Sequence, residues 1–336
     1  MTQARRPCVR LARTFVSFSI SAAALAGLRA APLPDGLRLT SAANVTLRQT
    51  PTAGAPAVGQ LPLGTELTDV GPPGMDKTWI RVRASDGREG WVMTSLTRRL
   101  DPIWRWTTYD QIIADRLARK GDGFPAAVEL VTFIDRVLPE YTNPDGRAQV
   151  EYNRLRAIAA AVRAIPFNHG RREPYAAWLK SWSAVVVYDE PGGRWLMADT
   201  AIWSLHARSS KAPVADAVAW FAVTNGLGGE CEGYLPCYVD WRNRLEGEYL
   251  RRHPDGRHAD AAVAAVKGTI DRLSAPPRPR EAFAFEPGRD CRDLTRSLDA
   301  LGKAVGATRA EDKDAALASL ATLGKFCSSD RDLSRR

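Results

Sequence analysis

The segment from Leu37 to Leu100 constrains the fold most strongly, because short runs of strand-like residues alternate there with turn residues. Five runs have the alternation or the β-branched content of short strands: Asn44–Arg48, Ala57–Gly59, Glu66–Val70, Trp79–Arg83 and Glu89–Met93. Asp86-Gly87 lies between the last two runs, and Asp-Gly between alternating strands predicts a β-hairpin. Strands this short cannot bury a core as one flat sheet, so we expect a small β-barrel.

The order of these runs resembles the bacterial SH3-like (SH3b) family. The matching residues are Asn44–Arg48 with Pro51 after it, Val58-Gly59, Leu63–Thr65, Trp79–Val82 and Gly90–Val92. The resemblance implies a small β-barrel that commonly binds peptidoglycan stem peptides, other envelope polymers or a neighbouring domain, and it does not imply catalysis. Where the family often has Gly-Pro-Ser after the first arginine, this chain has Gln49-Thr50-Pro51.

Four residues of this segment are candidates for a ligand-binding groove of the SH3-like domain: Trp79, Trp91, Arg48 and Arg81. The competing interpretation places at least one of the two tryptophans in the core, because aromatic side chains dominate small cores.

The first thirty residues have the pattern of a cleavable secretory signal. Arginines precede an apolar run from Thr14 to Leu28, and Ala24–Ala26 or Ala30-Ala31 offers small residues for cleavage. The run is too short for a membrane span, and no cysteine follows it as a lipoprotein anchor requires. We therefore expect a periplasmic or secreted protein with no integral membrane span after cleavage.

Removal of this signal lowers the net charge of the chain. The whole chain has 47 Lys and Arg against 38 Asp and Glu, but five arginines and no acidic residue lie in the first thirty positions. The remaining chain then carries 42 basic and 38 acidic residues, a balance of about +4 instead of +9. Nucleic acid is therefore not an expected partner.

After residue 100 the periodicity becomes helical, which predicts a mainly α-helical domain over 101–274 with one β-hairpin near 184–198. The expected helices cover Tyr109–Leu117, Ala126–Leu138, Val150–Ile165, Val214–Val223, Tyr238–His253 and Ala259–Leu273. No sequence repeat recurs at a fixed period, so a solenoid is not expected. The chain is thus assigned to the α+β class.

The expected domains follow from these patterns. They are a signal peptide (1–30), an SH3-like barrel (31–100), the helical domain (101–274), a proline-rich linker (275–288), a helical hairpin (289–328) and a flexible tail (329–336).

Four cysteines remain after signal removal, and an even number in an exported chain predicts disulfides. Cys291 and Cys327 each lie eighteen residues from Arg309 in the turn of the expected terminal hairpin, so antiparallel helices would bring them side by side. That arrangement leaves Cys231 to pair with Cys237 across a short loop containing Gly and Pro.

The cysteines of this region have two competing interpretations. Cys231 and Cys237 with His253 and His258 have the ligand types of a zinc site, although the cysteine spacing is wide and oxidation competes. Cys291 at a helix start resembles the nucleophile of papain-like endopeptidases, but no histidine follows it to act as base. We therefore expect no metal site, no cofactor and no catalytic cysteine. His169 and His206 stand alone in the sequence.

Carboxylates and tryptophans give two further candidates. Glu230, Glu232 and Asp240 surround the cysteine loop and could form the paired carboxylates of a glycoside hydrolase. Eight tryptophans of the helical region could form a stacking platform or pack in the core: Trp104, Trp106, Trp178, Trp182, Trp195, Trp203, Trp220 and Trp241. The solvated-loop and core explanations are favoured.

Three functions remain. The favoured one is a noncatalytic exported cell-envelope protein whose SH3-like domain binds peptidoglycan or a protein partner. The alternatives are a peptidoglycan-remodelling hydrolase with a site near Gly229–Asp240, and an envelope assembly or structural factor whose barrel packs on its own helices. The sequence leaves the oligomeric state open.

Overall fold

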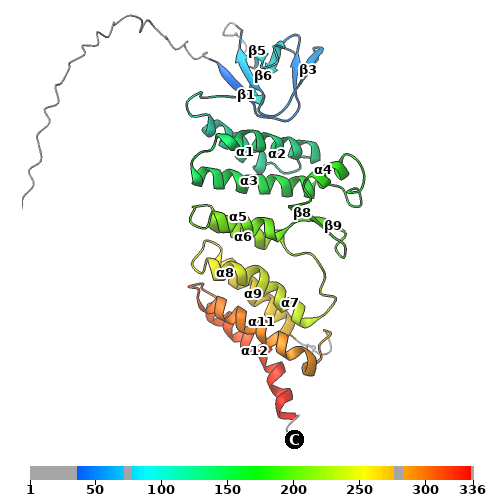
Figure 1. Ribbon diagram of the computed structural model, residues 1–336, viewed down its shortest axis with the longest axis vertical. Coiled ribbons are helices and arrows are strands. Elements are labelled where there is room, and N and C mark those ends of the chain that lie inside the picture. Colours follow the sequence, from blue (N-terminus) through cyan, green and yellow to red (C-terminus); the bar gives the residue numbers. More distant parts are fainter. Residues whose placement is uncertain (1–35, 72–77, 276–282, 334–336) are drawn as a thin grey trace, which may run out of the picture. The chain divides into compact units, whose positions relative to one another are not determined.

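The N-terminal part of the chain is a seven-stranded antiparallel sheet, which is followed by helices and one separate hairpin (Figure 1). The computed structural model describes residues 36–71, 78–275 and 283–333, with side chains as far as Cys327. The expected signal and half of the expected proline-rich linker lie outside the described residues. The α+β class predicted from the sequence is confirmed.

The sheet has the strand order β3-β2-β6-β5-β4-β1-β7. Its strands are β1 (Leu37–Thr40), β2 (Val45–Arg48), β3 (Ala57–Leu61), β4 (Glu66–Asp69), β5 (Trp79–Ala84), β6 (Glu89–Met93) and β7 (Thr97–Arg99). Its own core consists of the apolar residues that alternate along these strands: Val45, Leu47, Leu61, Leu67, Val82, Ala84 and Val92.

The Asp86-Gly87 turn joins β5 to β6 as the sequence predicted. Gly87 has a φ of 86°, and its N–H donates to the carbonyl oxygen of Ala84 at 2.9 Å. The Asp86 carboxylate accepts a hydrogen bond from the backbone N–H of Arg88 at 3.1 Å. Glycine is favoured here because an L side chain rarely adopts a positive φ.

Two of the seven strands, β1 and β7, were not predicted from the sequence. They pair with each other, and β1 also pairs with β4. The side chain of Arg38 on β1 donates to the hydroxyl of Thr97 on β7 at 2.8 Å. Both strands are short and carry charged residues, so pairing with the rest of the sheet decides their conformation more than local propensity does.

The helical region begins at Arg105. It comprises α1 (Arg105–Ala118), α2 (Phe124–Val137), α3 (Pro144–Arg163), α4 (Tyr175–Ser181), α5 (Asp199–Arg208), α6 (Ala215–Asn225), α7 (Leu235–Arg242), α8 (Glu248–Arg252), α9 (Ala259–Ser274), α11 (Pro287–Gly306) and α12 (Lys313–Leu333). Short 3₁₀ turns lie at Thr94–Leu96 and Leu138–Glu140, and a π turn at Asn243–Gly247. The strands of the hairpin are β8 (Val186–Asp189) and β9 (Arg194–Met197).

Several helix boundaries differ from those expected. The helix expected over Val150–Ile165 begins earlier, because Asn143 caps α3 by accepting from the N–H of Asp145 at 2.9 Å, and Pro144 is its first residue. The helices α4 and α5 were not predicted. The β-hairpin was expected near 184–198, whereas β8 begins at Val186 because the backbone around Trp182 still turns after α4.

The C-terminal half also departs from the expectation in detail. The single helix expected over 238–253 is divided by the π turn at Asn243–Gly247. The helix α12 continues to Leu333, through part of the segment expected to form a flexible tail. In the described part of the chain, each helix is too short or too polar to span a bilayer.

The sheet and the first helices share one hydrophobic core. Leu39, Leu63 and Leu100 pack in the same cluster as the apolar residues of α1, α2 and α3. The Leu63 N–H donates to the Glu129 carboxylate at 3.1 Å, and Arg136 donates to the Leu63 carbonyl oxygen at 3.0 Å. Residues of the expected barrel domain thus help to build the core of the helical region.

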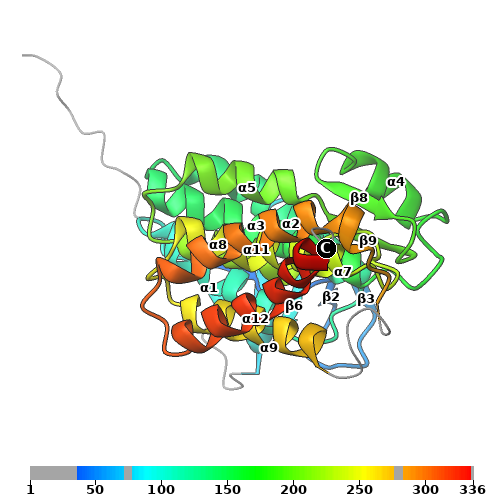
Figure 2. The same cartoon turned by 90° about the horizontal axis from the view of Figure 1, so that it is seen from below.

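A second cluster joins α7, α9, α11 and α12. The hairpin packs on the first cluster through Val186 and Met197, as expected for a two-stranded ribbon that is unstable alone. Figure 1 and Figure 2 both show α4 beside this hairpin.

Candidate functional site

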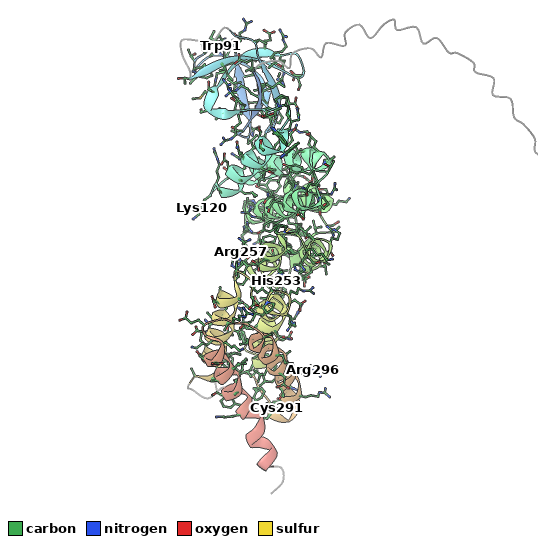
Figure 3. All side chains as sticks on the ribbon, turned by 90° about the vertical axis from the view of Figure 1, so that its left-hand side faces the viewer. Trp91, Lys120, His253, Arg257, Cys291 and Arg296 are labelled. Atoms are coloured by element: carbon green, nitrogen blue, oxygen red, sulfur yellow. A yellow bond between two sulfur atoms is a disulfide. The ribbon has the colours of Figure 1, made fainter. Side chains whose placement is uncertain are left out.

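Three of the four predicted groove residues form a row across adjacent strands. Arg48 on β2 lies directly opposite Trp91 on β6, and Trp91 lies directly opposite Arg81 on β5. Directly paired residues of an antiparallel sheet project from the same face, so these side chains are neighbours. Figure 3 labels Trp91 on the sheet. We call Arg48, Trp91 and Arg81 the Arg-Trp-Arg row.

Gly90 and the carboxylate of Glu89, both on β6, lie next to this row. A side chain at Gly90 would meet the Arg48 carbonyl oxygen at 2.6 Å, so glycine permits the close approach of β2 to β6. Glu89 forms an ion pair with Arg81 at 3.2 Å and with Arg83 at 2.6 Å. The hydrogen bond from Arg83 is the main reason that the pKa of Glu89 lies below its ordinary value. Sequence reasoning did not single out Glu89, although its place across the Asp-Gly turn from Arg83 was a usable signal.

The two arginines of the row retain capacity for a ligand. Arg48 donates from Nη1 to the Ala55 carbonyl oxygen at 2.7 Å, which fixes one end of its guanidinium. Half of the Arg81 side chain, 49%, is exposed despite its ion pair with Glu89. Trp91 is partly buried between them. A flat indole between two guanidinium groups can contact an apolar group and carboxylates of the same ligand.

Trp79, the fourth predicted residue, begins β5 opposite Met93 of β6. Only 9% of its surface is exposed, which leaves little area for a ligand. The alternative that at least one tryptophan is buried therefore describes Trp79 better than Trp91.

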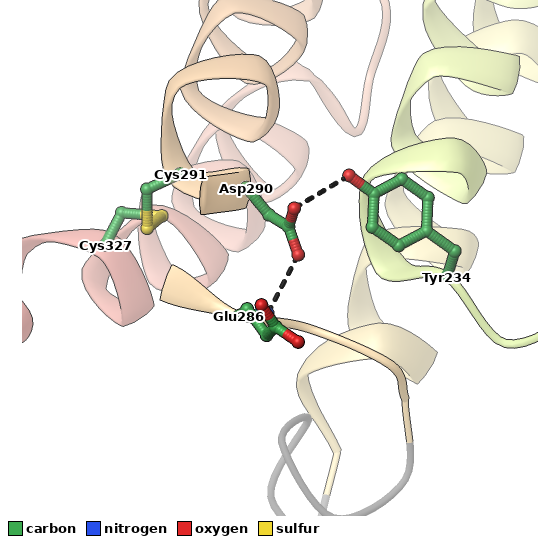
Figure 4. Close-up of a disulfide and its surroundings, with 5 residues drawn as sticks. All are labelled: Tyr234, Glu286, Asp290, Cys291 and Cys327. Atoms are coloured by element: carbon green, nitrogen blue, oxygen red, sulfur yellow. Dashed lines mark hydrogen bonds between the residues drawn. A yellow bond between two sulfur atoms is a disulfide. The ribbon is translucent and has the colours of Figure 1, made fainter. Parts of the chain in front are cut away.

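The four predicted cysteines lie in two pairs at disulfide distance, Cys231–Cys237 and Cys291–Cys327. Figure 4 shows the second pair beside the start of α11. There the buried carboxylate of Asp290 accepts hydrogen bonds from the Tyr234 hydroxyl at 3.0 Å and from the Glu286 N–H at 2.8 Å. Disulfide pairing removes the thiolates that a zinc site or a nucleophile needs.

The carboxylates considered for glycoside hydrolysis are not assembled into a pair by any contact in the described residues. Glu230 and Glu232 are exposed on the loop before α7, and Asp240 is partly buried on α7. The side chains of all three make no hydrogen bond or ion pair with another described residue. In that part of the chain no group of three or more His, Cys, Asp and Glu residues could hold a metal ion.

Most of the tryptophans considered for a stacking platform pack against the helical cores. Those that do so are Trp178, Trp182, Trp195, Trp203 and Trp220. Trp104 and Trp106 instead remain 54% and 42% exposed and contact each other edge to face at 5.0 Å. Core packing therefore explains five of the eight tryptophans, and this is the interpretation favoured from the sequence.

His206 does not stand alone, which corrects the interpretation from the sequence. Its Nε2 atom lies 2.8 Å from Nε2 of His253, and only 4% of the residue is exposed. One ring must donate and the other must accept, so a proton on both rings would break this hydrogen bond. Sequence reasoning missed the contact because the two histidines are 47 positions apart.

The histidine pair predicts a pH-dependent stability. Desolvation by burial is the main cause that lowers the pKa of both His206 and His253 from 6.5, and the charges of His253 and Arg252 add to it for His206. Between the lowered pKa and 6.5 the unfolded chain binds more protons, so stability is lost as the pH falls through this window. We expect the free energy of unfolding to fall by on the order of 1 kcal/mol between pH 7.5 and 5.5.

Urea unfolding at several pH values tests this expectation with His206→Gln and with His169→Gln as the matched control. The slope should flatten in His206→Gln and stay as in the unaltered protein in His169→Gln. The comparison between variants is needed because burial raises the pKa of Glu246 and Asp110, which gives a slope of opposite sign. An unchanged slope in His206→Gln would contradict the assignment.

Comparison with known proteins agrees with the resemblance seen in the sequence. A family model described as bacterial SH3 domain matches residues 43–97, which include β2 to β6 and the Arg-Trp-Arg row. The chain therefore contains a bacterial SH3 domain in its N-terminal part. No curated protein and no solved structure matches the chain.

Proposed function

We propose that this protein is an exported cell-envelope protein whose SH3-like domain binds peptidoglycan or a protein partner, without a catalytic site of its own. The Arg-Trp-Arg row is the observation that carries this proposal. It places an aromatic surface between two cations on adjacent strands. Such an arrangement suits a peptide that carries carboxylates, because a guanidinium can pair with a carboxylate through two parallel hydrogen bonds.

Two observations support the export that the proposal requires. The first thirty residues have the charge and apolar pattern of a secretory signal. The four cysteines beyond it are all at disulfide distance from a partner, which is compatible with an oxidising compartment. The protein is accordingly assigned to the periplasm or the extracellular space.

A second candidate function is an assembly or structural factor, and the core shared between sheet and helices favours it. Because Leu39, Leu63 and Leu100 pack among the helices, part of the surface of the SH3-like domain is already occupied within the chain. The hydrolase gains no comparable support, since Glu230 and Glu232 are exposed and make no side-chain hydrogen bond or ion pair with another described residue.

Co-sedimentation of the whole chain, without residues 1–30, on purified peptidoglycan sacculi tests the favoured function. We expect saturable binding that Trp91→Ala weakens roughly tenfold, because a partly buried tryptophan is a common centre of binding energy. Arg81→Gln should weaken binding less, since Glu89 already pairs with this arginine. The supernatants are assayed for soluble muropeptides, which we expect to be absent.

Trp106→Ala is the matched control, because Trp106 is also exposed in part but lies in α1. It should bind as the unaltered protein does. Binding that is insensitive to Trp91→Ala would remove the row from the function, and failure of the unaltered protein to bind would favour the assembly factor. Release of muropeptides would instead establish a hydrolase.

A further inference from the structure

A pocket of about 1190 Å³ opens in the helical region, away from the residues proposed for peptide binding. It lies between the end of α3, the segment 165–171, α4, the β8–β9 hairpin and the end of α6. Ligand pockets typically have volumes of about 300–1,000 Å³, so this one has room for a drug-sized organic molecule.

The lining of the pocket is positively charged. It contains Arg163, Arg171, Lys180 and Arg194 and no aspartate or glutamate. In the described part of the chain, the side chains of Arg163, Arg171 and Lys180 make no hydrogen bond or ion pair. Only Arg194 has an acidic partner, Asp189, at 3.6 Å. Three cations without counter-charges around one hollow create a positive potential that attracts anions.

The side chain of Arg163 is exposed and lies near a further cation, Arg156. Desolvation, together with the nearby charge of Arg156, lowers the pKa of Arg163 from its ordinary value. An anion in the pocket would relieve this unfavourable environment, because opposite charge favours the protonated form of a base.

One wall of the pocket is aromatic. Trp195 and Tyr188 lie on opposite strands of the hairpin with ring centroids 5.1 Å apart, and both line the pocket. Phe167 lies at the same pocket and is 73% exposed. A side chain on Gly170 would come within 2.1 Å of the Trp195 Nε1 atom, so glycine allows the indole to lie against this segment.

The floor is apolar and the remaining polar groups are few. Val162, Leu179 and Met197 are buried beneath the pocket. Asn225 donates its side-chain amide to the Met197 carbonyl oxygen at 3.0 Å, which holds the end of α6 against β9. A largely apolar pocket with a small number of charged groups is the usual composition of an organic ligand site.

We propose that this pocket binds an organic anion whose flat apolar body packs on Trp195 and Tyr188 and whose anionic oxygens pair with Arg171 and Lys180. The absence of acidic lining residues opposes a cationic ligand, and the aromatic wall and volume exceed what a simple inorganic anion needs. This binding site is separate from the Arg-Trp-Arg row. It gives the helical region, for which the family match offers no role, a function of its own.

Two fluorescent probes with the same ring system test the proposal on the whole chain. The anionic probe is 8-anilinonaphthalene-1-sulfonate, and the neutral one is N-phenyl-1-naphthylamine, which lacks the sulfonate. We expect saturable binding of the anionic probe with energy transfer from tryptophan. The double variant Arg171→Gln/Lys180→Gln should weaken it roughly tenfold and should change binding of the neutral probe by less than about twofold.

Lys120→Gln/Arg296→Gln is the control for general charge, since both residues are exposed and lie outside the pocket (Figure 3). It should leave binding of both probes unchanged. Displacement by phenyl phosphate or by benzoate would support the proposal and would rank the phosphate against the carboxylate as the anionic group.

Equal weakening of both probes in the pocket variant would overturn the assignment of Arg171 and Lys180 to the anionic group of the ligand. Equal affinity of the two probes for the unaltered protein, with no effect of the pocket variant, would overturn the proposal. Thermal unfolding of each variant verifies that the fold is retained. Sacculus binding by the same double variant should be unaffected, so failure here is distinguishable from failure of the proposed peptide-binding function.

Discussion

Replacing Gly64 with alanine is expected to lower the free energy of unfolding by about 3 kcal/mol. Gly64 has a φ of 70°, which an L side chain rarely adopts, and an added Cβ would lie 2.3 Å from the ring of Phe133. The ring is only 1% exposed and cannot move into solvent. Arg136 also donates to the Gly64 carbonyl oxygen at 2.8 Å, so the loop cannot shift without losing this contact. Urea unfolding measures the change.

Gly87→Ala is the matched control, because Gly87 has a similar φ of 86° but no atom within 4 Å of the added Cβ. Its expected loss is about 1 kcal/mol, from backbone strain alone. The difference between the two variants therefore isolates the steric contribution of the contact between the sheet and α2. Equal losses would mean that the Gly64 loop does not pack tightly on the helices.

The same contact predicts how the chain unfolds. Leu63 is buried in the helical cluster, and Arg136 of α2 donates to its carbonyl oxygen. A change in this loop should consequently shift the unfolding of the sheet and of the helices together. Two separate transitions would mean that the sheet and the helices unfold independently, on either side of the domain boundary expected at residue 100.

Local patterns explain why the central strands were predictable. The alternation of Val45 with Leu47 and the Asp86-Gly87 turn act within a few residues, so each predicts its own strand or hairpin. The edge strand β7 has no such signal in Thr97–Arg99, and its conformation depends on pairing with β1, nearly sixty positions earlier in the chain. Contacts of that sequence separation are not encoded in local propensity.

The two candidate sites also differ in how far they could be predicted from the sequence. Arg48, Arg81 and Trp91 were predicted as groove residues of the SH3-like domain, but their alignment in one row needed the register of three strands. The pocket was not predicted, because its lining comes from five segments between Ala159 and Asn225. Trp195 was noted only as one of many tryptophans. No short-range spacing relates it to Arg171 or Lys180.

The pairing of Cys291 with Cys327 could be predicted although the two residues are far apart in the sequence. Two antiparallel helices around one turn bring residues at equal distances from that turn side by side, and Cys291 lies beside Cys327 as this argument requires. The bridge joins α11 to α12, whose apolar residues pack in the second core. The disulfide therefore restrains a pair of helices that also pack by hydrophobic contact.

Replacing both of these cysteines with alanine is expected to lower the free energy of unfolding by about 4 kcal/mol, because the bridge closes a long loop of the unfolded chain. The two residues are 36 positions apart. Cys231→Ala/Cys237→Ala is the matched control, because that pair is only 6 positions apart, and its expected loss is about 2 kcal/mol.

Urea unfolding of both double variants, and of the unaltered protein with and without a reducing agent, measures these losses. Reduction should reproduce the sum of the two effects if the bridges act independently, since one joins α7 to the loop before it and the other joins α11 to α12. A smaller loss from the Cys291 and Cys327 pair than from the shorter loop would contradict the loop-entropy explanation. The helix packing of α11 on α12, and not the covalent link, would then be the main source of stability in this part of the chain.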